Sequence, residues 1–128
     1  MWWPSADGIC ELHDALIAAT GGAPGVRDRG AVESAVARPL AGFAGQPFYP
    51  DLVARAAALA DALVRNHGFV DGNKPTAMAA ALGVLDQAGL VVEANDAAIE
   101  DAAVRLAERR WDLASFTAWL RANLRQAP

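Results

Sequence analysis

The sequence predicts an all-α fold, and three observations support this prediction. Apolar residues recur at intervals of three and four in several segments, as they do on the buried face of a helix. No segment shows the period-two alternation of a half-buried strand. Alanine, the residue with the highest helix propensity, is the commonest in the chain. A length of 128 residues suits one domain, so we expect a single compact domain of about six helices over residues 1–128.

The first two helices are predicted from capping residues and turn signals. Ser5 or Asp7 can cap a helix that the glycine- and proline-rich segment 21–25 ends. Asp28 can cap a short second helix that ends before Pro39, because proline disfavours the helical conformation of the residue before it. The predicted apolar face of the first helix comprises Ile9, Leu12 and Leu16.

Residues 40–50 form a loop rich in glycine and proline. A loop of this kind can dock a partner, but we favour the interpretation that its aromatic rings fold back onto the core. The rings belong to Phe43, Phe48 and Tyr49.

Two longer helices follow this loop. Asp51 can cap a helix whose apolar stripe continues to about Asn66. The next helix is expected from about Asn73 to Ala88, with Gly89 just beyond its C-terminus.

The C-terminal third of the chain predicts two more helices. Leu90–Glu93 is short enough to be a connector or a minor strand. Asn95 and Asp112 can cap the last two helices. The apolar face of the last helix is expected to comprise Leu113, Phe116, Leu120 and Leu124.

The charge and composition exclude several classes of protein. The net charge is −4, so we do not expect the chain alone to bind nucleic acid through its phosphates, and we expect Arg105, Arg109 and Arg110 to be solvated surface. Cys10 is the only cysteine and cannot form an internal disulfide, which indicates a reducing, cytoplasmic compartment. No apolar stretch of about 18 residues occurs, so we expect no membrane-spanning helix. Met1–Pro4 lacks the basic region of a secretory signal.

One segment, residues 66–76, concentrates polar groups between the two longest predicted helices. Gly72 can turn the chain sharply, and the first amides of the helix that begins near Asn73 form an anion site. Lys74 adds a positive charge in the first turn, where it opposes the helix dipole unless an anion is bound. Asp71 can hold a divalent cation beside phosphates, and an imidazole such as that of His67 suits proton abstraction from a hydroxyl.

Structural explanations exist for each of these residues taken singly. Gly72-Asn73 is a common turn, Asp71 or Asn73 can cap a helix, and a lone histidine such as His67 is more often structural. Their concentration in eight residues at a helix start favours a functional site. His13, beside Asp14 in the first helix, can approach this site, although a structural role is the favoured interpretation.

The run from His67 to Lys74 resembles the signature of the Fic/Doc family, His-x-Phe-x-Asp/Glu-Ala/Gly-Asn-Lys/Gly-Arg. Lys74 and the short chain resemble the Doc (death on curing) branch, because the adenylyl-transferring Fic branch usually has glycine at that position. The resemblance extends to Gly25–Asp28, Ala37–Leu40 and Leu63–His67.

This resemblance implies a toxin of a toxin–antitoxin pair that transfers the γ-phosphate of ATP to a threonine of elongation factor Tu and blocks translation. His67 would be the catalytic base, Asp71 would hold Mg²⁺, and Gly72, Asn73 and Lys74 would bind the phosphates. A Phd-like antitoxin would inhibit by folding a tail helix into a groove on the toxin.

The family pattern continues with arginine where this chain has Pro75. Proline is tolerated in the first turn of a helix, so the fold should survive, but the phosphate clamp and one amide are lost. Three explanations are open. The chain is a weakened or repurposed enzyme, it is an inactivated variant, or another arginine such as Arg65 takes the place of the missing motif arginine. We favour a strongly weakened enzyme. An AMP transferase and a catalytically dead, antitoxin-binding member remain as alternatives.

Overall fold

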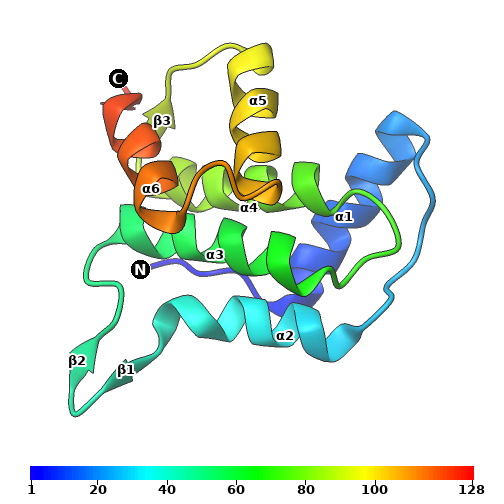
Figure 1. Cartoon of the computed structure of the whole chain (residues 1–128), viewed down its shortest axis with the longest axis horizontal. Helices are drawn as coiled ribbons and strands as arrows, with labels where there is room; N and C mark the ends of the chain where they lie inside the picture. The colour runs from blue at the N-terminus through cyan, green and yellow to red at the C-terminus, as the bar shows by residue number, and fades with distance from the viewer.

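Helices α3 (Leu52–Asn66) and α4 (Asn73–Gln87) form the centre of the fold in the computed structural model, which describes residues 1–128 (Figure 1). Every residue of α3 from Ala56 to Leu63 is buried, because its small alanine side chains let other helices approach on all sides. The surrounding helices are α1 (Ala6–Thr20), α2 (Arg29–Ala37), α5 (Asp96–Ala107) and α6 (Leu113–Ala122).

These helices enclose one hydrophobic core of 22 buried residues, so the prediction of a compact all-α domain is confirmed. In Figure 1, α2 lies along one side of α3, α5 and α6 lie along the other, and α1 crosses near the start of α4. None of the helices is long and apolar enough to cross a membrane.

The predicted helix starts are confirmed by five side-chain caps. In each, an oxygen of the capping side chain accepts a hydrogen bond from the backbone amide three residues later. Ser5, and not Asp7, caps α1. The other capping residues are Asp28, Asp51, Asn95 and Asp112. Gly89 follows α4 with a φ of 78°, as predicted for a residue beyond a helix C-terminus.

The buried face of α1 differs from the predicted one. Ile9, His13 and Ile17 are buried, whereas Leu12 and Leu16 are only half-buried. The buried residues are four apart and form a single ridge toward the core. His13 is fully buried on this ridge, four residues from each of Ile9 and Ile17.

The prediction that the aromatic loop packs on the core is wrong. After the 3₁₀ turn η1 (Arg38–Leu40), two short strands, β1 (Gly42–Phe43) and β2 (Gln46–Pro47), form a hairpin that projects from the domain (Figure 1). Phe43 and Phe48 are 77% and 62% exposed, and only Tyr49 is half-buried. The hairpin turn has positive φ at both central residues, and its strands are too short to give a period-two signal.

The end of the last helix also differs from the prediction. Helix α6 ends at Ala122, and Leu124 lies in strand β4 (Leu124–Gln126) rather than in the helix. β4 pairs antiparallel with β3 (Leu90–Val92), so the short segment after α4 is a minor strand and not merely a connector.

Candidate functional site

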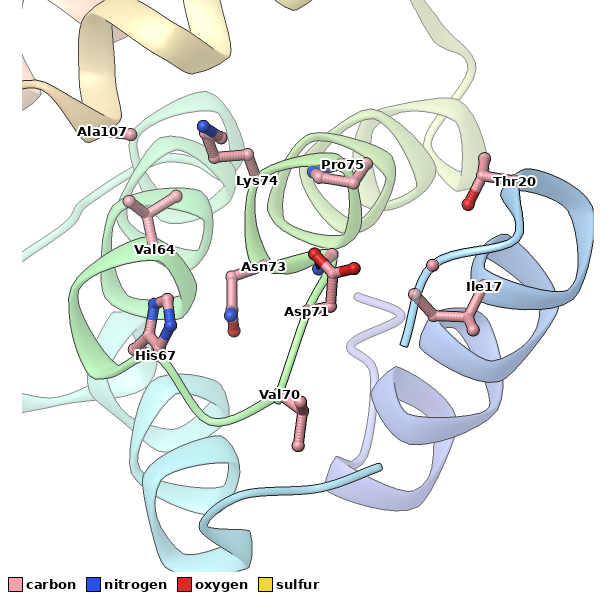
Figure 2. Close-up of a pocket in the computed structure, with 12 residues that line it drawn as sticks. Ile17, Thr20, Val64, His67, Val70, Asp71, Asn73, Lys74, Pro75 and Ala107 are labelled. Carbon is pink, nitrogen blue, oxygen red and sulfur yellow. Dashed lines mark hydrogen bonds between the residues drawn. The ribbon is translucent and has the colours of Figure 1, made fainter. Parts of the chain in front are cut away.

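A cleft of about 540 Å³ lies where the C-terminal ends of α1 and α3 meet the start of α4 (Figure 2). The segment 66–76, singled out in the sequence, supplies seven of its twelve lining residues. The remaining wall comes from Val64, just before this segment in α3, and from residues distant in the sequence. The lining residues are Ile17, Thr20, Gly22, Val64, His67, Val70, Asp71, Gly72, Asn73, Lys74, Pro75 and Ala107.

His67 stands at the end of α3, on one wall of the cleft (Figure 2). Its backbone is left-handed, with φ 49° and ψ 51°, a conformation that usually favours glycine at this point of a helix. Arg27 holds this turn from outside, since its guanidinium donates to the carbonyl oxygens of His67 at 2.7 Å and Asn66 at 3.2 Å. The imidazole itself is exposed and has no partner in the structure, so it is available to a substrate.

The loop after His67 is held by backbone pairing with the α1–α2 connector. The Gly68 carbonyl accepts from the amides of Arg27 and Asp28, and the Val70 amide donates to the Gly25 carbonyl. Gly68 permits this close approach, because a Cβ atom there would lie 2.7 Å from Cγ2 of Val32. The loop is therefore a fixed edge of the cleft.

The buried side chain of Asn73 holds the loop by two hydrogen bonds to the backbone of Phe69. Its side-chain Oδ1 accepts from the Phe69 amide at 3.1 Å, and its Nδ2 donates to the Phe69 carbonyl at 2.9 Å. Asn73 is only 7% exposed, so this pair of bonds is shielded from water. The side chain of Asn73 therefore shapes the loop, and only its backbone amide is left for the predicted phosphate contact.

Substituting Asn73 with alanine is expected to destabilise the protein by about 2 kcal/mol, because the buried amide and carbonyl of Phe69 lose their partners. Asn66→Ala is the matched control, since it removes one half-buried hydrogen bond to Ala31 and is expected to cost about 1 kcal/mol. Urea unfolding of the two variants measures the difference. Equal losses of stability would show that the Asn73 side chain does not lock the loop.

Asp71 presents its carboxylate at the middle of the cleft (Figure 2). One oxygen accepts from the Ala23 amide at 3.1 Å and the other from the Gly72 amide at 2.9 Å. These backbone hydrogen bonds lower the pKa of Asp71 below its ordinary value, so the carboxylate stays ionised. Gly72 makes this arrangement possible, because its φ of 77° is the left-handed turn that starts α4.

Asp71→Asn is expected to lower the free energy of unfolding at neutral pH but to leave it unchanged in strong acid. The folded pKa of Asp71 lies below the unfolded one, so its stabilisation is complete above the unfolded pKa and is lost as the pH falls through the folded pKa. Urea unfolding from neutral to acid pH should therefore show the two stability curves converging. Glu100→Gln, at an exposed carboxylate without a hydrogen bond, is the control for the loss of one negative charge. A constant offset between the Asp71→Asn and parent curves would contradict this account.

The start of α4 offers a ready site for an anion. The backbone amides of Asn73 and Lys74 have no acceptor, and the helix dipole places positive potential there. Lys74 is exposed and forms no ion pair, and Figure 2 shows it extending toward Ala107 across the cleft. Pro75 occupies the third helical position, where it has no amide to offer.

The cleft thus combines a free imidazole, an ionised carboxylate and a cationic helix start. Residues 3–85, more than half of the chain, match the sequence model of the Fic/DOC family. The chain belongs to the Fic/DOC family. It is 47% identical over 105 residues to Toxin Doc of Mycolicibacterium smegmatis, a match covering 80% of each chain. It is 38% identical over 88 residues to Protein kinase doc of Escherichia phage P1, covering 69% of each chain. These relatives confirm the predicted Doc branch.

No arginine of this Fic/DOC chain replaces the one absent at Pro75. Arg65, the predicted candidate, does not line the cleft, and its guanidinium is bonded to Asp61 at 2.9 Å. Arg109 binds the other oxygen of the same carboxylate at 3.2 Å. Arg105 and Arg110 also have acidic partners, and the side chains of all three arginines of the cluster are solvent-exposed in large part, as expected.

Sequence reasoning found the loop residues of the site but not the opposite walls. Ile17, Thr20 and Ala107 are ordinary helix residues, and nothing in their local sequence marks them. His13 is different, because its four-residue spacing from Ile9 and Ile17 places it on the buried ridge. That spacing was the available signal for its burial.

Proposed function

We propose that this chain is a Doc-type toxin of a toxin–antitoxin pair. It acts in the cytoplasm as a protein kinase that transfers the γ-phosphate of ATP to a threonine of elongation factor Tu, and a Phd-like antitoxin inhibits it. The observation that carries the proposal is the meeting of His67, Asp71 and the free amides of Asn73 and Lys74 in one cleft. The names of the two relatives, a toxin and a protein kinase, support the same assignment.

The proposed reaction assigns one task to each part of the cleft. His67 accepts the proton of the threonine hydroxyl while the threonine oxygen bonds to the γ-phosphorus. The bond from that phosphorus to the bridging oxygen breaks, and ADP leaves. Lys74 and the two free amides stabilise the negative charge on the phosphate oxygens.

The residues present fit a magnesium ion bound together with ATP. The Asp71 carboxylate is exposed in the cleft, and each of its oxygens accepts a single hydrogen bond in the structure. Mg²⁺ typically takes one or two carboxylates and completes its coordination with phosphate oxygens and water. Asp71 would therefore hold the ion, which neutralises phosphate charge when bound.

In this proposal the kinase activity is strongly weakened, because Pro75 stands where the family has arginine. The proline ring lines the cleft beside Asp71 but carries neither charge nor amide hydrogen. A guanidinium binds phosphate oxygens in two-point fashion, and its loss is severe in phosphoryl transfer. The same change favours the alternative in which the protein acts only by binding its antitoxin.

Label transfer to purified elongation factor Tu tests the proposal. The protein is incubated with the factor, Mg²⁺ and ATP labelled at either the γ- or the α-phosphate, and the modified residue is located by mass spectrometry. Label from the γ-position alone, on threonine, is the expected result. Label from the α-position would indicate AMP transfer. No label from this chain or from its Pro75→Arg variant would leave the binding-only function.

A further inference from the structure

His13 does not line the cleft but contacts the backbone of the site loop from within the core. It lies in the middle of α1 and is fully buried. Its imidazole stacks on the ring of Phe69, with centroids 3.9 Å apart and planes within 6°. A leucine or phenylalanine could fill this space, so packing alone does not explain a histidine here.

The polar atoms of His13 are used unevenly. Nε2 lies 2.8 Å from the backbone carbonyl oxygen of Asp71, and because a carbonyl only accepts, Nε2 must carry the hydrogen. Nδ1 is buried without a hydrogen-bond partner, and its nearest charged neighbour is the exposed carboxylate of Asp14 at 3.6 Å. A buried nitrogen without a partner is unfavourable. The bond from Nε2 to Asp71 is therefore the feature that distinguishes histidine from an apolar residue.

This bond is one of three that fix Asp71. The carbonyl is held by His13 on α1, and the two carboxylate oxygens are held by the amides of Ala23 and Gly72. The left-handed turn at Gly72 packs directly on α1, where a Cβ atom would lie 3.1 Å from Ile17 and 3.6 Å from the His13 ring. Movement of the Asp71 carbonyl would therefore also move the turn that aims the carboxylate.

We propose that His13 is a positioning residue, which holds the Asp71 carbonyl through Nε2–H and thereby keeps the Asp71 carboxylate directed into the cleft. The inference rests on the proposed function only in naming this carboxylate as the magnesium ligand. Outer-shell partners of this kind typically change metal affinity by about tenfold or more when they are lost.

Two polar substitutions separate this role from simple packing. The amide nitrogen of glutamine can reach about as far as Nε2 of histidine, whereas that of asparagine reaches only as far as Nδ1. His13→Gln should therefore keep the bond to Asp71, and His13→Asn should lose it. Ile9→Ala, one turn earlier on the same buried ridge, controls for a general loss of stability in α1.

The first measurements need neither nucleotide nor target. In His13→Asn we expect the amides of Ala23 and Gly72 to exchange with solvent about tenfold faster relative to the core amides of α3. The NMR chemical shifts of the same two amide protons should also change, because their hydrogen bonds to the Asp71 carboxylate are weakened. His13→Gln and Ile9→Ala should leave both quantities as in the parent protein.

Equal behaviour of His13→Asn and His13→Gln in both measurements would overturn the positioning role, as would the same local loosening in Ile9→Ala. If His13→Asn does not fold, parent-like exchange at Ala23 and Gly72 in His13→Leu would overturn the role in the same way. Electron paramagnetic resonance with Mn²⁺ and ATP then tests the metal, with affinity expected to fall about tenfold in His13→Asn. Absence of Mn²⁺ binding by the parent protein would contradict the proposed metal site and leave the exchange result to decide the role of His13.

Discussion

Replacing Pro75 with arginine is expected to raise the rate of phosphoryl transfer to elongation factor Tu by about 10³-fold. Pro75 is exposed, lines the cleft and stands in the first turn of α4, so an arginine there can extend toward the phosphates. The substitution also restores a third amide to the two that are free at Asn73 and Lys74. The fold should tolerate the change, because the loss of proline rigidity costs no more than about 1 kcal/mol.

Pro75→Ala is the matched control for this prediction. It restores the amide without the guanidinium, so it separates the two deficits that proline causes. A single added hydrogen bond to a charged phosphate is expected to raise the rate by about tenfold. Initial rates with γ-labelled ATP measure all three proteins. Equal rates for Pro75→Arg and the parent protein would contradict the assignment of position 75 to the phosphate site.

Removing the imidazole of His67 in the Pro75→Arg background is expected to lower the transfer rate by about 10²- to 10⁴-fold. His67 is the only histidine on the cleft, and its ring is exposed and free of other partners. His67→Asn is the appropriate variant, because asparagine tolerates the left-handed conformation found at φ 49°. His67→Ala would add a backbone cost of about 1 kcal/mol to any chemical effect.

The transfer rate, the stability to urea and the ATP affinity of His67→Asn together show whether His67 acts as the base. His67→Asn should keep the unfolding midpoint in urea, because the side chain is exposed, and the affinity for ATP, because the proposed phosphate site is at the start of α4. A rate that is unchanged in His67→Asn would exclude His67 as the base. A rate that falls only in proportion to a loss of ATP binding would assign the residue to substrate binding instead.

Local features of the sequence were sufficient to place most helices and half of the site. A cap such as Asp51 acts on an amide three residues away, so its effect can be predicted without knowledge of the fold. The same holds for the turn at Gly72 and for the place of Pro75 in a first helical turn. The aromatic hairpin was predicted wrongly, because whether Phe43 and Phe48 reach the core depends on the direction of the turn between them.

The sequence by itself determined the helices, the family and the loop that bears His67, Asp71 and Lys74, because each depends on residues close together in the chain. Only the tertiary structure decided how that loop is held and what faces it. The bonds from His13 and Ala23 to Asp71 join residues 58 and 48 positions apart. Such contacts exist only once α1 packs against α4, and no local pattern encodes that packing. The pairing of Arg65 with Asp61 is local, since the two residues are four apart in α3, but the second arginine on the same carboxylate, Arg109, comes from 48 positions away.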